Sequence, residues 1–188
     1  MATSILTGFL PHFFYSQFFV TPQYPTQDCT GKTIIVTGGN TGLGKEAARH
    51  FVRLNAKKVI ITSRDATKGT TAKQDIETST KRTGVVEVWE LDLQDYGSVK
   101  KFAERAKGLE RLDVMVENAG INTFDFKMAA GHESTITVNV VSTFLLALLL
   151  LPTLQQSGKK YGFTPNLTIV SSEVHFVTQG RTTSSGVP

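Results

Sequence analysis

The stretch TIIVTGGNTGLG, from Thr33 to Gly44, decides the fold. It begins with a β-branched run and continues as a glycine-rich turn from Gly38 to Gly44. The next apolar residues are spaced for one face of a helix: Leu43, Ala47, Phe51 and Leu54. Glycine lets a backbone approach a phosphate closely, and a helix N-terminus offers free N–H donors to an anion. This order of strand, turn and helix therefore predicts a dinucleotide site.

Size and composition favour one globular domain. The chain has 188 residues, of which 40% are hydrophobic, enough for one core and short for two. Its formal net charge of +4 is scattered, and no basic stripe interleaved with aromatic residues is present, so a nucleic-acid partner is not supported. The single cysteine, Cys29, cannot form an internal disulfide, which fits a reducing compartment. We expect a cytoplasmic protein.

The two ends differ from the middle of the chain. Residues 1–28 are rich in Phe and Tyr and contain no Lys or Arg, so they do not have the pattern of a secretory signal peptide. We interpret them as an aromatic arm packed against the domain, with a shallow membrane-surface anchor as the alternative. Residues 29–178 form the predicted domain, and residues 179–188 are polar and predicted to be a disordered tail.

Strand and helix patterns alternate along the domain, which predicts an α/β fold with a doubly wound parallel sheet. The further predicted strands are Lys57–Thr62, Val85–Leu91 (nearer the sheet edge), Leu112–Val116 and Leu167–Ser171. The further predicted helices are Ala66–Thr80, Asp95–Lys107 and Glu133–Leu154. The continuous apolar run in the last helix is too short to span a bilayer, so we expect a buried or interface helix.

The end of the second strand indicates which dinucleotide is bound. In a doubly wound fold an acidic residue there binds the ribose 2′-hydroxyl of NAD, whereas an arginine accommodates the 2′-phosphate of NADP. Here Ser63 is followed by Arg64 and then Asp65. This order favours NADP. Two alternatives remain open: Arg64 is only a solvated residue at the strand end, or Asp65 is the acidic residue that binds the ribose 2′-hydroxyl.

Several motifs together resemble the short-chain dehydrogenase/reductase family. The glycine spacing Thr37-Gly38-x-x-x-Gly42-x-Gly44 matches its cofactor turn, Asn118-Ala119-Gly120 follows the fourth strand, and Ser171-Ser172 follows the fifth. The resemblance implies a Rossmann-like fold and an NADP-dependent oxidoreductase that transfers hydride between NADPH and a small-molecule carbonyl or alcohol. The aromatic arm, the Glu117-Asn-Ala-Gly spelling and the Ser-Ser-Glu-Val-His segment are similar to fungal members of secondary-metabolite pathways.

The resemblance also implies roles for individual residues. Ser172 orients the substrate oxygen, and Asn139 holds a water in the proton relay; a metal site is not expected. The predicted cofactor-binding residues are Gly38, Asn40, Gly42, Leu43, Gly44, Lys45, Ser63, Arg64, Asp92, Leu93, Asn118, Ala119 and Gly120. Structural alternatives stay open: Asp92 as a turn or helix cap, Asn139 bonded to a backbone carbonyl, Lys45 as a solvated surface residue, and the serine pair as a cap.

The family pattern stops before its acid/base pair, a tyrosine with a lysine four residues later. No Tyr and no Lys follow Ser172 among the 188 residues. Tyr161 is a poor substitute because Pro165 stands four positions on and because we expect it in a loop, Gln155–Pro165, at the far end of the fifth strand. The predicted sheet is therefore truncated after the fifth strand, with an open edge that favours self-association. The alternative function is a catalytically inactive remnant that binds a cofactor or a partner.

Overall fold

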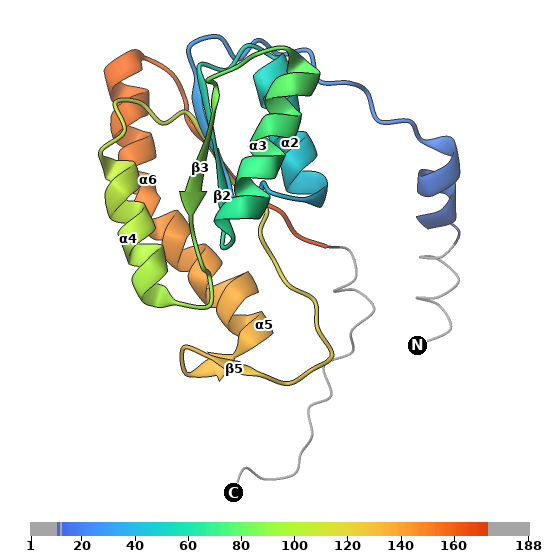
Figure 1. The fold of residues 1–188 in the computed structure, drawn as a ribbon, viewed down its shortest axis with the longest axis vertical. Helices are drawn as coiled ribbons and strands as arrows, with labels where there is room; N and C mark the ends of the chain where they lie inside the picture. Colours follow the sequence, from blue (N-terminus) through green and yellow to red (C-terminus); the bar gives the residue numbers. More distant parts are fainter. Residues whose placement is uncertain (1–10, 12, 173–188) are drawn as a thin grey trace, which may run out of the picture. The chain divides into compact units, whose positions relative to one another are not determined.

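The computed structural model describes residue 11 and residues 13–172 (Figure 1). The chain divides into two compact units, Thr26–Val170 and a terminal unit made of Met1–Pro25 and Ser171–Pro188. The predicted tail, residues 179–188, lies outside the described residues. In the terminal unit, residues 13–19 are helical, and Phe14 stacks on Phe18 as Tyr15 does on Phe19. The packing of this arm against the domain stays a prediction, as does its alternative at a membrane surface.

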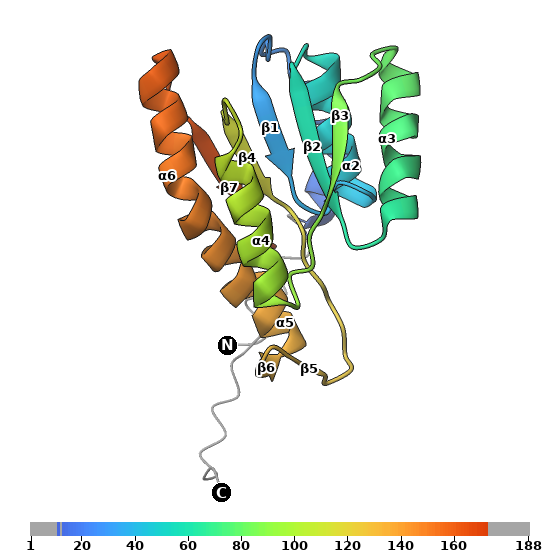
Figure 2. The ribbon, with the colours of Figure 1, turned by 60° about the vertical axis from the view of Figure 1, so that its left-hand side comes forward.

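Five parallel strands form the centre of the larger unit, in the order β3-β2-β1-β4-β7 (Figure 2). Their bounds are β1 Thr33–Val36, β2 Lys58–Ser63, β3 Val86–Glu90, β4 Val114–Glu117 and β7 Asn166–Ile169. In register, Ile35 of β1 lies opposite Ile60 of β2 and Met115 of β4. This arrangement confirms the predicted doubly wound, Rossmann-like sheet, with β3 at one edge.

Two helices cover each face of the sheet (Figure 2). On one face lie α2 (Gly42–Arg53) and α3 (Ala66–Thr80), and on the other α4 (Tyr96–Lys107) and α6 (Thr143–Tyr161). Side chains alternate along a strand, so Ile34 and Val36 pack in the cluster with α2 and α3, whereas Ile35 packs in the cluster with α4 and α6. Burial on both faces explains the continuous apolar strands.

Aspartate side chains fix the starts of two helices. The Asp65 carboxylate accepts the backbone N–H groups of Thr67 and Lys68 at the start of α3. Asp95 accepts the N–H of Gly97 at the start of α4. Both contacts satisfy donors that a helix leaves free in its first turn. The predicted bounds of α3 are confirmed, and those of α4 differ by one residue.

The long apolar helix is not uniform. It consists of α5 (Ser134–Ile136), the π-helix η1 (Thr137–Ser142) and α6, and it continues to Tyr161. The expectation that residues 155–161 form a loop is therefore wrong. Ser134–Tyr161 is also long and apolar enough, by length and composition alone, to cross a bilayer. Because Leu146 and Leu150 are fully buried in the core cluster under α6, we assign it as a core helix.

A short hairpin was not predicted. Strands β5 (Met128–Ala129) and β6 (His132–Glu133) pair antiparallel before α5. The two residues between them, Ala130 and Gly131, have φ angles of 47° and 87°. Positive φ at both central positions gives a turn whose twist matches a hairpin. The sequence signal for such a turn is usually Asn-Gly or Asp-Gly, which is why Ala-Gly did not suggest one.

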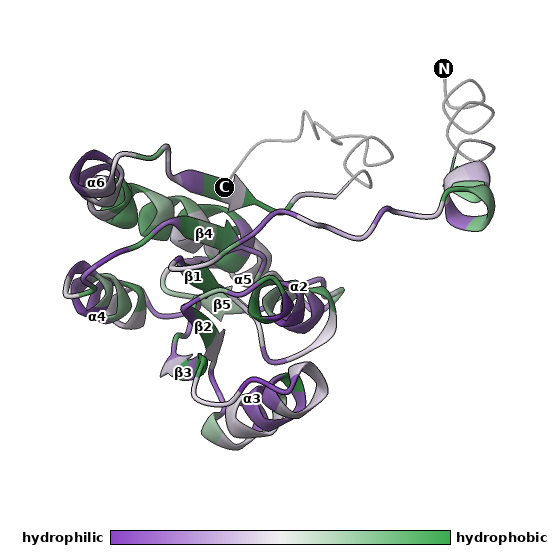
Figure 3. Cartoon of the chain, turned by 90° about the horizontal axis from the view of Figure 1, so that it is seen from above, coloured by the Kyte–Doolittle hydropathy of each residue, from purple (hydrophilic) through white to green (hydrophobic). Residues whose placement is uncertain are grey.

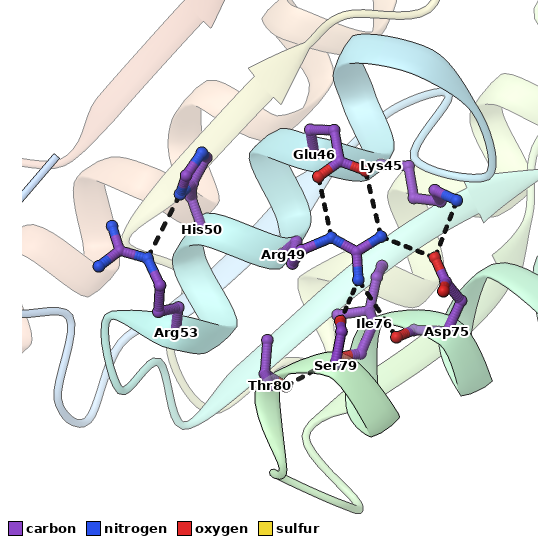
Figure 4. Close-up of polar contacts among 9 residues, drawn as sticks. All are labelled: Lys45, Glu46, Arg49, His50, Arg53, Asp75, Ile76, Ser79 and Thr80. Atoms are coloured by element: carbon purple, nitrogen blue, oxygen red, sulfur yellow. Dashed lines mark hydrogen bonds and ion pairs between the residues drawn. The ribbon is translucent and has the colours of Figure 1, made fainter. Parts of the chain in front are cut away.

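A charged cluster joins α2 to α3 (Figure 4). The Arg49 guanidinium lies 2.8 Å from Glu46 and 2.6 Å from Asp75 and also donates to Ser79. Lys45 lies 2.9 Å from the same Asp75 oxygen. The hydrogen bonds from Lys45 and Arg49 lower the pKa of Asp75 to about 2. Two cations therefore share one carboxylate and hold the two helices together.

The single tryptophan, Trp89, joins β3 to α4. It is 4% exposed, and its ring meets Phe102 edge to face with 5.6 Å between ring centroids. The Arg105 guanidinium carbon lies 3.9 Å from the Trp89 ring centroid. Arg105 thus covers the ring with a cation–π contact.

Candidate functional site

A cleft of about 490 Å³ opens at the carboxyl ends of four strands. Parallel strands place all of their carboxyl ends at one edge of the sheet, so segments far apart in sequence meet there. The cleft is lined by Gly38, Asn40, Thr41, Gly42, Leu43, Thr62, Ser63, Arg64, Asp65, Lys68, Leu91, Asp92, Leu93, Gln94, Asn118, Ala119, Gly120, Ile121 and Val138. Eleven of the predicted cofactor residues are on this wall; Gly44 and Lys45 are not.

The glycine turn leads into α2 without a side-chain cap. Gly38 and Gly42 have φ angles of 64° and 53°, a region that L side chains rarely adopt. Thr41 is the N-cap residue, but its side chain makes no capping hydrogen bond, and the first turn of α2 has no acidic residue. The helix N-terminus therefore faces the cleft with free N–H donors and a partial positive charge. An anion fits this place.

Gly44 does not line the cleft but sets the shape of its floor. A Cβ atom at this position would lie 2.4 Å from the amide nitrogen of Asn118 and 2.6 Å from the carbonyl oxygen of Gly38. A side chain there would push the turn away from the end of β4. The close approach explains why the third glycine of the motif is needed.

Two threonines that are not among the predicted cofactor-binding residues connect the strand ends. The Thr37 hydroxyl accepts the backbone N–H groups of Asn118 and Ala119, each at 3.0 Å. The Asn118 amide donates to the Thr37 carbonyl oxygen at 3.0 Å, and the Gly38 N–H donates to the Thr62 hydroxyl at 3.1 Å. Thr37 and Thr62 thus fix β1, β2 and β4 relative to one another. In the sequence, the only indication of this role is that each threonine stands at the end of a strand.

The end of β2 presents cations to the cleft. Arg64 and Lys68 both line it, and no hydrogen bond or ion pair of either side chain occurs among the residues that the structure describes. Asp65 lies between them, but its carboxylate caps α3. The Ser63 hydroxyl donates to the Asp65 carbonyl oxygen at 2.7 Å. Lys68 is a further cation that the sequence analysis missed, one helical turn beyond Arg64.

The end of β3 supplies Asp92, Leu93 and Gln94. The Asp92 carboxylate accepts the N–H of Gln94 at 2.9 Å, so Asp92 is a turn residue, while the cap of the following helix is Asp95. Leu93 is buried, and its carbonyl oxygen accepts the Ser142 hydroxyl at 2.6 Å. Asp92 is half-buried and lines the cleft, and its role in cofactor binding stays a prediction.

Asn139 lies in the π-helix and is bonded to the backbone after β4. Its side chain accepts the N–H of Ile121 and donates to the carbonyl oxygen of the same residue, both at 2.8 Å. The structural alternative for Asn139, a contact with a backbone carbonyl, is therefore present. The π-helix places the side chain against the loop Asn118–Ile121 and fixes that wall of the cleft.

Of the predicted residues in the larger unit, Gly44, Lys45 and Asn139 do not line the cleft. Lys45 does not line it, because its Nζ atom pairs with Asp75 of α3. Ser172 follows β7, is exposed and belongs to the terminal unit. Its role toward a substrate stays a prediction. Among the described residues no group of three potential metal ligands is present.

Glu117, which precedes Asn118-Ala119-Gly120, ends β4 next to the cleft wall. Its side chain is 3% exposed, and neither carboxyl oxygen has a hydrogen-bond partner in the described part of the chain. Burial raises the pKa of Glu117 to about 8. At neutral pH the isolated chain therefore holds this carboxyl in its protonated form.

Tyr161 lies at the other edge of the sheet. It lines a second cavity with Thr33 and Lys57, which are at the amino ends of β1 and β2. Its hydroxyl donates to the Glu110 carboxylate at 3.2 Å, and the Arg111 guanidinium carbon lies 4.8 Å from its ring centroid. Tyr161 therefore does not reach the cleft, as predicted.

Comparison with known proteins identifies the family. The sequence model described as short chain dehydrogenase matches residues 32–178. A short-chain dehydrogenase/reductase of a Cryptosporiopsis species is 51% identical over 87% of this chain and 51% of its own length. A short chain dehydrogenase of Emericella nidulans is 52% identical over 91% of this chain and 55% of its own length. The chain thus spans about half the length of the curated relatives it matches.

Solved structures agree with the fold. A short chain dehydrogenase from Escherichia coli complexed with NADPH is 32% identical and has a TM-score of 0.66, over 84% of this chain and 65% of its own. One from Sphingobium yanoikuyae, also in complex with NADPH, has a TM-score of 0.65 at 24% identity and shows the fold alone. The predicted similarity to fungal members is confirmed by the curated relatives. This chain belongs to the short-chain dehydrogenase family of nicotinamide-dependent oxidoreductases.

Proposed function

We propose that this chain binds NADP and is the cofactor-binding part of an oxidoreductase that transfers hydride between NADPH and a carbonyl or alcohol. One observation carries the proposal: the uncapped N-terminus of α2 lines the same cleft as Arg64 and Lys68, two cations without a side-chain partner among the described residues. A helix N-terminus suits a pyrophosphate, and arginine or lysine suits a terminal phosphate. The separation of these two anion sites within one cleft fits a dinucleotide with a 2′-phosphate.

The residues at the end of β2 support NADP over NAD. In a doubly wound fold the carboxylate that binds a ribose 2′-hydroxyl stands at the end of this strand. Ser63, the last residue of β2, offers only a hydroxyl bonded to Asp65, and the Asp65 carboxylate is held at the start of α3 by the two helix N–H groups that its Oδ1 atom accepts. Arg64 and Lys68 would instead balance the charge of a 2′-phosphate. The NADPH bound to the Escherichia coli relative is consistent with this choice.

When bound, the nicotinamide cofactor supplies the hydride. In the proposed arrangement Gly38, Leu43 and the first turn of α2 hold the pyrophosphate, and Asp92 and Asn118 hold the adenine side. Ser172 orients the substrate oxygen, and Asn139, which fixes the loop at Ile121, holds a water of the proton relay. The similarity to fungal relatives supports a substrate from secondary metabolism.

The second candidate is a chain that binds the cofactor without catalysing its oxidation. The observation that favours it is the position of Tyr161, which is the last tyrosine of the 188 residues and is bonded to Glu110 at the opposite edge of the sheet. The described residues that line the cleft include no tyrosine. Incubation with NADPH and a panel of ketones separates the candidates, because only the first predicts loss of NADPH absorbance.

The NADP proposal is tested by calorimetric titration with NADPH and NADH. Charge-assisted contacts are worth about 1.5–3 kcal/mol, so Arg64→Ser and Lys68→Ser should each weaken NADPH binding by roughly 10- to 100-fold. The binding of NADH should stay unchanged. Lys101→Ser, on the exposed face of α4, removes a charge away from the cleft and serves as the control. Equal affinity for both nucleotides, or equal losses in both, would refute the proposal.

A further inference from the structure

A short helix ahead of the larger unit displays aromatic side chains that the proposed cofactor site does not use. Residues 13–19 are helical, and five of these seven residues are Phe or Tyr. Phe14, Tyr15, Phe18 and Phe19 are all exposed, with Phe18 at 74% and Phe19 at 75%. Large aromatic side chains dominate the energetics of cores and interfaces, and apolar surface left in water is typical of an interaction site. The exposed rings therefore indicate a contact surface.

The four rings lie on one side of the helix, in two stacked pairs. Phe14 stacks on Phe18 with 6.2 Å between ring centroids, and Tyr15 stacks on Phe19 with 5.5 Å. Residues four apart are neighbours on a helix, so the two pairs run side by side along it. The four positions together span about 140° of the helix circumference. We call this surface the aromatic face.

The rest of the helix is more polar. Ser16 and Gln17 lie outside the aromatic face, and the Ser16 hydroxyl donates to the carbonyl oxygen of Phe13 at 2.8 Å. Phe13 also lies on this side, but it is the least exposed of the five rings at 39%. Figure 3 shows hydrophobic segments and a hydrophilic one on this helix, which is the one nearest to the N label. The helix is therefore amphipathic, and its larger apolar side consists of aromatic rings.

The absence of charge around the aromatic face favours a lipid partner over a protein partner. Every Lys, Arg, Asp and Glu of the sequence comes after Gln27. Charged groups normally steer a protein partner and fix its register, and the sequence offers none here. A lipid interface has no such requirement, because aromatic rings gather at the level of the headgroups. Tyr15 suits this place because it has an apolar ring and a hydroxyl that stays hydrated.

An irregular segment separates this helix from the sheet. Residues 20–28 contain no helix or strand and include Pro22 and Pro25. The Cys29 N–H, which donates to the Leu54 carbonyl oxygen, is where the chain joins the larger unit. Proline favours extended, semi-rigid chain, and nine residues span at most about 30 Å. This length allows the helix to lie in a lipid interface while the larger unit stays in water.

We propose that the aromatic face binds the headgroup interface of a lipid bilayer and holds the chain at the membrane surface. Phe14, Phe18 and Phe19 enter the boundary between headgroups and acyl chains, and Tyr15 keeps its hydroxyl among the headgroups. Anionic lipid is not required, because the sequence of the arm contains no Lys or Arg. The proposal is independent of NADP binding, because the arm lies outside the residues that line the cleft.

The test is flotation of the 188-residue chain with vesicles made of phosphatidylcholine alone. We expect the chain to float with the vesicles and to stay bound in about 0.5 M NaCl, because burial of apolar surface is not screened by salt. The double variant Phe18→Ser, Phe19→Ser should lower the partition coefficient roughly 100-fold, about tenfold for each ring. Ser and Phe have similar helix propensities, so the variant retains the helix. Gln17→Ser is the control and should change partition by less than about twofold.

A second pair of variants tests which side of the helix meets the lipid. An indole introduced by Phe18→Trp should be quenched by brominated phosphatidylcholine, whereas one introduced by Gln17→Trp should be quenched much less. Failure to float, binding that needs anionic lipid or is lost in salt, unchanged partition of the double variant, or equal quenching at the two positions would each overturn the proposal. Light scattering without vesicles covers the remaining occupant, because oligomers that the double variant abolishes would assign the aromatic face to a second copy of the chain.

Discussion

We expect the buried Glu117 carboxyl to make the stability of the chain fall as pH rises. Between pH 4.5, the ordinary pKa, and about 8, the pKa in the fold, the folded chain keeps a proton that the unfolded chain has released. The free energy of unfolding must therefore decrease over this range. One pKa unit corresponds to about 1.4 kcal/mol, so the full shift is worth about 5 kcal/mol. Domains are typically stable by about 5–15 kcal/mol, so the effect is large.

Urea unfolding followed by circular dichroism at pH 5 and pH 9 measures this loss. Glu117→Gln cannot ionise, so its stability should vary much less with pH and should exceed that of the parent chain at pH 9 by up to about 5 kcal/mol. At pH 5 the two proteins should be similar. Glu90→Gln removes an exposed carboxylate and should behave like the parent. Parallel pH profiles for the parent and Glu117→Gln would refute the reasoning, because the carboxyl would then be solvated or paired.

Three further substitutions test the contacts of the site and the helix layer. Thr37→Val should lower the free energy of unfolding by about 2–3 kcal/mol, because two backbone N–H groups lose their acceptor. Thr37→Ser keeps the hydroxyl and should retain most of the stability in urea unfolding. Equal losses in the two variants would show that the hydroxyl is not the stabilising group. Gly44→Ala should lower the free energy of unfolding by about 1–3 kcal/mol through overpacking, and it should weaken NADPH binding in calorimetric titration. Unchanged stability and unchanged affinity would contradict the close approach of Gly44 to Asn118 and Gly38. Arg49→Met should lower the free energy of unfolding by about 1–2 kcal/mol in thermal unfolding at low salt, and by less in 1 M salt. The control Lys107→Met should change stability by under about 0.5 kcal/mol. A loss that does not depend on salt would show that Arg49 stabilises the helices by packing and not by charge.

The fold and most of the cleft could be predicted because they follow from local patterns. Each β-branched run ended in glycine or polar residues, and parallel strands bring such ends to one edge of the sheet. This is why Gly38, Arg64, Asp92 and Asn118 lie in one cleft although they are far apart in sequence. The fold class could be predicted because the alternation of strand and helix patterns is also visible in the local sequence.

The remaining features depend on contacts between elements, which a single sequence does not display. Lys45 stands in the first turn of α2, and its pairing with Asp75 depends on how α3 packs beside that helix. The bonds from the Thr37 hydroxyl depend on the register between β1 and β4. The π-helix at Asn139 is a local change in hydrogen bonding within an apolar run, and the apolar run itself predicts only a helix.

The position of Trp89 has a practical consequence for optical work. Because it is the single indole in the chain, tryptophan emission comes from one place, the contact between β3 and α4. Asp92 lies two residues beyond the end of β3 and lines the cleft, so a ligand that reorders this part of the cleft should change the tryptophan emission. The emission of Trp89 thus offers a local optical signal beside the end of β3.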